Sequence, residues 1–121
     1  MLVALWIVNA LLALAFVATG LLKLVRSKAQ LKEMGLGWTD DYSPAVIRTI
    51  GVAELIGAAG LILPLATGIA VILAPIAAVC LAVLMVGAIP AHRRHGESFA
   101  PPLVLLVLAI ASAVLGFLVA L

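Results

Sequence analysis

The sequence has little charge for its length. Charged side chains make up 10% of the 121 residues, against roughly a quarter in an ordinary soluble chain, and 67% of the residues are hydrophobic. A soluble fold of this size could not bury so much apolar surface, because small domains leave much of their chain exposed. The scarcity of charge therefore excludes a soluble globular protein and indicates a single integral membrane domain over residues 1–121.

Other absences narrow the class further. Cys80 is the only cysteine, which excludes an intramolecular disulfide and the paired thiols of a thiol–disulfide oxidoreductase. We expect it to be a small buried apolar residue. The net charge of +2 is too small to indicate nucleic acid binding. No Lys or Arg occurs among the first ten residues, so the basic region of a signal peptide is missing and we expect a retained helix there.

Four apolar segments are long enough to cross a bilayer, which takes about 20 helical residues. Only a helix satisfies its own backbone polar groups in lipid, so the predicted fold is all-α, an antiparallel four-helix transmembrane bundle. The hydroxyl of Ser43 and the ring of Pro44 favour a helix start at that point. Residues 64–68 are predicted to form a turn, and Pro75 is predicted to kink the third helix. The expected helices cover about residues 2–22, 44–64, 67–91 and 99–121.

Basic residues lie on one side of this bundle only. The connections that follow the first and third helices carry six of them, and the opposite side carries none. The positive-inside rule then predicts a multi-pass protein of the cell membrane, with both of these loops in the cytoplasm and both termini outside. The six residues are Lys23, Arg26, Lys28, Lys32, Arg93 and Arg94.

The first connection alternates basic and apolar residues from position 23 to position 34. We expect an amphipathic extension of the first helix that lies on anionic headgroups through its lysines and arginine and ends at Gly35 and Gly37. Trp38 and Tyr42 follow it and are expected in the aromatic belt at the membrane interface.

Glu54 is a carboxyl group placed about 15 Å into the second predicted helix, close to the centre of a core about 30 Å thick. A charge at that depth is costly, so Glu54 should face the bundle interior and be paired, hydrated or protonated. We expect a neutral Glu54 directed toward Asn9, with Ser112 at a similar depth as a second hydrogen-bond partner. Such a residue either serves a ligand or a proton, or only ties helices together.

Two other polar positions have simpler interpretations. Arg48 lies about 120° around the helix from Glu54, so we expect no direct pair and predict that it reaches the headgroups. His92 and His95 are three residues apart, but no Cys, Asp or third His joins them, so we predict no metal site and expect contact with headgroups or water.

Several segments, in this order, resemble the DoxX-like family of small four-helix membrane proteins. They are Gly20-Leu21-Leu22-Lys23-Leu24, residues 51–64 with Glu54, Met85-Val86-Gly87-Ala88-Ile89-Pro90-Ala91-His92, and Gly96-Glu97. The resemblance implies that Lys23, Arg48, Glu54 and His92 are the polar positions to watch. Relatives often carry a polar residue early in the fourth helix, whereas residues 101–104 here are Pro-Pro-Leu-Val.

The resemblance implies several functions, because family members are named for a subunit of a terminal quinol oxidase and others are linked to oxidative-stress complexes or to membrane-protein assembly. Our leading hypothesis is a non-enzymatic accessory module, redox-linked through its partner, with a site around Glu54 for a lipid or quinone-like molecule. The alternative is a small proton-coupled exporter that uses Glu54. A quinone-dependent enzyme ranks last, since the sequence shows no ligand set for a redox cofactor. The expected partners are the bilayer, another membrane protein or a second copy of the chain, and a hydrophobic small molecule.

Overall fold

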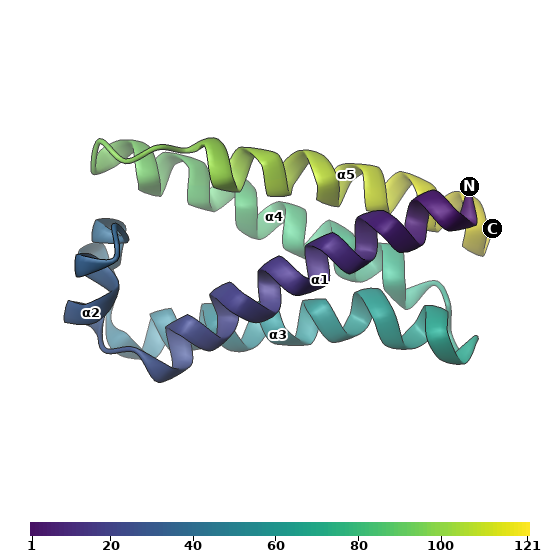
Figure 1. Ribbon diagram of the computed structural model, residues 1–121, viewed down its shortest axis with the longest axis horizontal. Coiled ribbons are helices and arrows are strands. Elements are labelled where there is room, and N and C mark those ends of the chain that lie inside the picture. The colour runs from purple at the N-terminus through teal and green to yellow at the C-terminus, as the bar shows by residue number, and fades with distance from the viewer.

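The four long apolar runs form four long antiparallel helices in a computed structural model that describes residues 1–121. All four are long and apolar enough to cross a membrane, so the protein is an all-helical, multi-pass membrane bundle, as predicted (Figure 1). Two short helical segments in the first connection complete the fold. The long helices are α1 (Leu2–Val25), α3 (Pro44–Thr67), α4 (Leu73–Arg94) and α5 (Ala100–Ala120).

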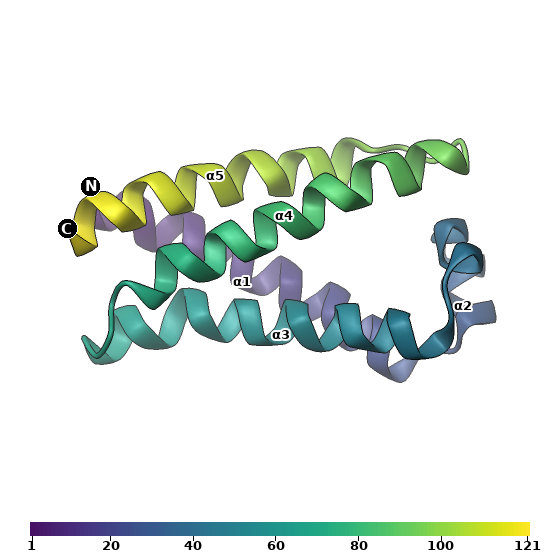
Figure 2. The same cartoon turned by 180° about the vertical axis from the view of Figure 1, so that it is seen from behind.

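The helices pack as two antiparallel pairs. Helix α1 packs along α3, and α4 packs along α5, while α3 contacts α4 and α1 contacts α5. Both termini lie at one end of the bundle, where α1 and α5 are close together (Figure 1). Toward the other end α1 and α5 move apart, as the view from behind also shows (Figure 2). The bundle is therefore more open at the end that carries the α1–α3 and α4–α5 connections than at the end that carries the termini and the α3–α4 turn.

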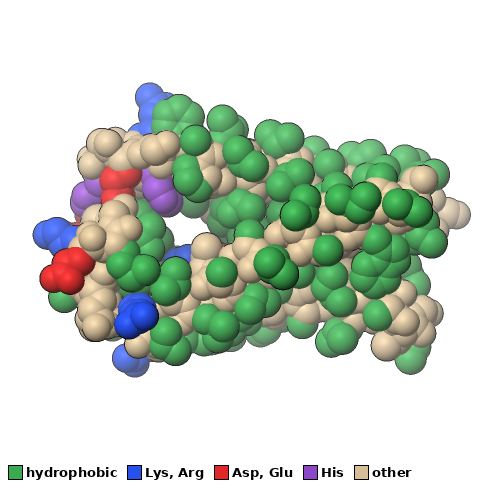
Figure 3. Space-filling view, viewed as in Figure 1, with side chains coloured by type: hydrophobic (Ala, Val, Ile, Leu, Met, Phe, Trp, Pro, Cys, Tyr) green, Lys and Arg blue, Asp and Glu red, His purple; other side chains and the backbone are tan.

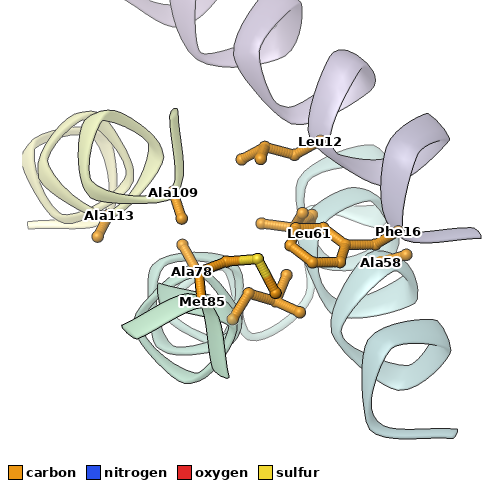
Figure 4. Packing of buried hydrophobic residues seen from close by; sticks show 9 residues of the cluster. Leu12, Phe16, Ala58, Leu61, Ala78, Met85, Ala109 and Ala113 are labelled. Atoms are coloured by element: carbon orange, nitrogen blue, oxygen red, sulfur yellow. The ribbon is translucent and has the colours of Figure 1, made fainter. Parts of the chain in front are cut away.

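Small side chains allow the four helices to meet at the centre (Figure 4). The core combines large residues of α1, α3 and α4 with alanines of α3, α4 and α5. Close packing of this kind stabilises helices in lipid, where burial alone gives no driving force. The outer surface is apolar over most of its area, as expected for contact with lipid (Figure 3). Cys80 lies on that exposed surface, so its expected burial is wrong. The core cluster is Leu12, Phe16, Ala58, Leu61, Ala78, Leu81, Met85, Ala109 and Ala113.

The turn between the second and third long helices lies later than predicted. Helix α3 continues through Pro64 and ends at Gly68, whose left-handed φ of 70° and N–H bond to the Pro64 carbonyl (2.9 Å) form the cap. Glycine adopts this left-handed conformation without steric cost. The helix therefore ends at Gly68 and not at Pro64, where the turn was predicted to begin. Helix α4 begins only at Leu73, so Pro75 lies in its first turn. There the missing N–H is not needed, and the predicted kink at Pro75 is wrong.

The first connection is a separate helix and not an extension of α1. Helix α2 (Lys28–Glu33) begins after Ser27, whose hydroxyl accepts from the Gln30 N–H (3.1 Å) while the Gln30 side chain accepts from the Ser27 N–H (2.9 Å). This reciprocal capping box breaks the chain direction after α1. Gly35, with φ 89°, ends the segment, and the short 3-10 helix η1 (Gly37–Asp41) follows.

Candidate functional site

A buried ion pair joins α1 to α3. The ammonium of Lys23 lies 2.7 Å from Oε1 of Glu54, and the Thr19 hydroxyl donates to Oε2 at 2.6 Å. The Lys23 and Glu54 side chains are only 9% and 2% exposed. Glu54 thus faces the bundle interior, as predicted, but its partner is a cation. The prediction of a neutral Glu54 assumed that no cation lies beside it, and Lys23 is such a cation.

The helix geometry explains why these two side chains meet. Side chains tilt toward the N-terminus of their own helix, and α1 and α3 run in opposite directions. Lys23, in the last turn of α1, therefore tilts into the bundle, and Glu54 tilts toward it. The helix backbones also cross closely, because a Cβ on Gly20 would lie 2.8 Å from the Gly51 carbonyl oxygen. Two glycines at the crossing bring the ammonium and the carboxylate within contact distance.

Aromatic side chains line the space beside the ion pair. The Trp38 ring of η1 is 7% exposed, and the Lys23 ammonium lies 5.8 Å from its centroid, within cation–π distance. The His92 ring of α4 lies 5.9 Å from the same indole, and its Nδ1 donates to the Ala88 carbonyl (2.9 Å). In the neutral ring this leaves Nε2 as an acceptor. The Trp38 indole N–H is buried and has no hydrogen-bond partner within the protein.

The loop after α4 holds η1 over this space. Glu97 accepts from the backbone N–H groups of Gly37 (2.8 Å) and Trp38 (3.2 Å), one with each carboxylate oxygen. His95 Nε2 lies 2.9 Å from an Asp41 carboxylate oxygen, which adds a second link between the two segments. The position of Trp38 is thus fixed from the opposite side of the bundle.

The ion pair and the aromatic side chains beside it line a cavity of about 300 Å³ at the open end of the bundle. Its volume is at the lower end of the usual range for small-molecule sites. Most of the wall is apolar, and the polar groups are Thr19, Lys23, Glu54, Trp38 and His92 together with Tyr42. Exposed residues on its rim, such as Val83 and Pro101, open it to the outside of the bundle. Figure 3 shows the molecule hollowed beside the end that carries the charged side chains.

Asn9 and Ser112 lie elsewhere, in a second polar cluster. Asn9 donates to the Leu61 carbonyl at 2.9 Å and accepts from the Ser112 hydroxyl. All three residues are buried, and the bonds tie α1 to α3 and α5. The expected contact of Glu54 with Asn9 and Ser112 is therefore wrong, because each of these two residues is bonded elsewhere. Neither residue lines the cavity, so their geometry is that of interhelical bonding.

Of the other two residues predicted from the sequence, one lines the cavity and one does not. His92 lines the cavity, whereas Arg48 is exposed, makes no ion pair with Glu54 and lies outside it. Trp38 was expected in the aromatic belt at the membrane interface, and its side chain is buried within the protein, against Lys23 and His92. Thr19 and Glu97 were not predicted as site residues. Thr19 could have been found, because it precedes Lys23 by four residues and so shares its helix face.

The exposed part of the first connection carries its own ion pair. Lys32 of α2 lies 2.8 Å from an Asp40 carboxylate oxygen. The hydrogen bond and the charge of Asp40 raise the pKa of Lys32 above 10.5, and the bond to Lys32 holds the pKa of Asp40 below its ordinary value of 3.8. Both groups are solvent-exposed, so salt should weaken this pair.

Comparison with known proteins bears on the identity of the chain. A sequence model described as the DoxX-like family matches residues 7–114. Comparisons with curated proteins and with solved structures gave no match. The match spans all four long helices and includes Lys23, Trp38, Glu54 and His92, which meet at the cavity. On this coverage, the chain belongs to the DoxX-like family of membrane proteins.

Proposed function

We propose that this protein is a non-enzymatic accessory module of the membrane that binds a hydrophobic small molecule, a lipid or a quinone-like compound, in the cavity beside Glu54. The observation that carries the proposal is the unpartnered indole N–H of Trp38, a residue that lines a largely apolar cavity. A buried donor without an acceptor costs about 1–3 kcal/mol. A ligand carbonyl or ester oxygen would remove that cost by accepting the bond.

The remaining polar groups favour a ligand with a compact polar head. The Lys23 ammonium is a second donor toward the cavity, and Nε2 of neutral His92 is an acceptor that suits a hydroxyl. Apolar residues such as Leu22, Ile50 and Leu105 suit a hydrocarbon ring or tail. The rim opens between helices, so the ligand would enter from the bilayer. A quinone or quinol matches this combination of donors, acceptor and apolar wall.

Trp38 also provides the readout of a binding experiment. The chain has two tryptophans, and a Trp6→Phe background leaves Trp38 as the only indole. Titration of this variant in detergent micelles with a benzoquinone carrying a ten-carbon tail should quench Trp38 fluorescence in a saturable manner. Ala88→Phe, which places a ring on the cavity wall, should abolish saturation, whereas Ala59→Phe, on an exposed face of α3, should not.

Two results would contradict the proposal. Quenching that rises linearly with quinone would indicate simple partitioning into the micelle. Equal saturable quenching in the Trp6→Phe background with and without Ala88→Phe would place the ligand outside the cavity. If quenching is saturable and Ala88→Phe abolishes it, mass spectrometry of lipids and quinones that copurify with the protein from native membranes would identify the class of compound. Proteins recovered in the same preparation would identify the partner.

A proton-coupled exporter remains the second candidate, because Glu54 itself lines the cavity. Transport of this kind would require the 2.7 Å pair with Lys23 to open in each cycle, so that the carboxyl group could exchange its proton. The pair favours the binding module for this reason. Reconstituted vesicles with an imposed pH gradient can separate the two functions. Substrate-dependent proton flux that Glu54→Gln abolishes would favour export.

A further inference from the structure

A second, smaller pocket lies where α1 ends, α2 begins and α3 makes its first turns. Eight residues line it, of which four are basic and none is acidic. It shares only Lys23 with the cavity described above, so it is a distinct site. Its lining residues are Lys23, Arg26, Ser27, Lys28, Leu31, Pro44, Ile47 and Arg48.

The positive charge of this pocket is not compensated within the protein. Lys23 is neutralised by Glu54 on the cavity side. Lys28 reaches the Asp40 backbone carbonyl at 3.3 Å, a weak contact. Arg26 and Arg48 form no ion pair with any carboxylate. The other cation of the first connection, Lys32, differs from these because it is paired with Asp40 at 2.8 Å.

Four cations line this one pocket, and like charges placed close together repel unless an anion lies among them. Guanidinium groups present a planar fork of donors that fits two oxygens of a phosphate, which an ammonium does not. Arg48 lies about 6 Å along α3 from its start, and the pocket includes the apolar residues Leu31 and Ile47. Leu31 and Ile47 are buried beneath the basic residues, so the pocket offers cationic donors to a phosphate group and no apolar surface to its chains. The phosphate of a lipid headgroup is the source that fits, because the pocket lies beside the first turns of a helix that can span a membrane.

We propose that this pocket binds the phosphate of an anionic phospholipid headgroup, with Arg26 and Arg48 as the principal ligands and Lys28 as a supporting cation. The sequence predicted diffuse attraction of four basic residues to headgroups, and separately that Arg48 reaches the headgroups. The proposal differs because two of those four, Lys23 and Lys32, are paired elsewhere, and Arg48 joins the remaining two from another helix. The site is independent of the ligand proposed for the larger cavity.

Thermal unfolding of the intact protein in a neutral detergent can test this site. Short-chain phosphatidylglycerol should raise the unfolding temperature in a saturable manner, and short-chain phosphatidylcholine should raise it much less. Arg26→Gln and Arg48→Gln should each weaken the apparent affinity for phosphatidylglycerol about tenfold or more, since each removes charge-assisted hydrogen bonds. Arg48→Lys, which keeps the charge and removes the fork, should also weaken it.

Arg93→Gln is the matched control, because Arg93 also forms no ion pair with a carboxylate, is exposed and lies outside the pocket. The affinity of the Arg93→Gln variant for phosphatidylglycerol should stay within about twofold of wild type, since a distant exposed charge contributes little. An equal loss in Arg93→Gln and Arg48→Gln would indicate general surface attraction and overturn the site. Equal stabilisation by inorganic phosphate at the same concentration would overturn the lipid as its source.

Discussion

The ion pair between Lys23 and Glu54 gives the most demanding test of this structure. Both side chains are almost fully buried and their charged atoms lie 2.7 Å apart. Lys23→Met removes the cation and leaves a buried carboxylate with one hydrogen bond, from Thr19. Breaking a buried pair in this way costs about 3–5 kcal/mol, so the free energy of unfolding should fall by that amount.

Removing the other partner of the pair should lower the free energy of unfolding by less. Glu54→Gln leaves the ammonium of Lys23 without a carboxylate, but Lys23 also borders the second pocket at the polar end of the bundle, where its side chain can turn toward water. We expect a loss of about 1–3 kcal/mol, the range for a polar group that loses its partner. The double variant Lys23→Met, Glu54→Gln removes both charges and should be more stable than Lys23→Met alone, because replacing a whole buried pair is often nearly neutral.

The assay is reversible unfolding in mixed micelles with a denaturing detergent, followed by helical circular dichroism. Lys32→Met is the matched control, since its pair with Asp40 is exposed and should contribute little. A double-mutant cycle isolates the interaction between the two charges. If Lys23→Met is no less stable than Lys32→Met, or if the two single effects simply add, the buried pair does not exist as described.

Four further predictions concern the glycine crossing of α1 and α3, the Glu97 link to η1, the exposed Lys32–Asp40 pair and the orientation in the membrane. Gly51→Ala places a Cβ 2.9 Å from a carbonyl oxygen of α1 and should destabilise the bundle by about 1–3 kcal/mol in the same unfolding assay, whereas Gly87→Ala meets no atom within 4 Å and should not. Glu97→Gln weakens the two bonds to η1, so fluorescence of the indole in that segment should shift to the red; an unchanged spectrum would refute the link. The folded pKa of Asp40 lies below 3.8, so its pairing with Lys32 stabilises the connection above that pH and is lost as pH falls through the folded value; the carboxyl titration should return toward 3.8 in high salt. A reporter fused to the C-terminus should be active outside the cytoplasm, and activity only inside would reverse the orientation predicted from the basic loops.

The sequence alone determined the number and approximate limits of the long helices. The length of the apolar runs and the requirement that lipid places on the backbone leave no other fold class. Local chemistry also predicted the helix start at Ser43 and Pro44 and the inward direction of Glu54, because a carboxyl group at that depth cannot face lipid. The segments quoted around Glu54 and His92 identified the family that the comparison confirmed.

The partners of these residues were decided only by the tertiary structure. In a soluble helix the apolar stripe marks the buried face, but in a bilayer both faces are apolar, and the pattern does not indicate which helices meet. The sequence therefore could not show that Lys23 turns inward to Glu54 or that Asn9 bonds with Ser112. Nor could it show that Glu97, in the loop after α4, holds Trp38 over the cavity. Those contacts join residues 31 to 103 positions apart in the chain, and only the packing of the helices brings them together.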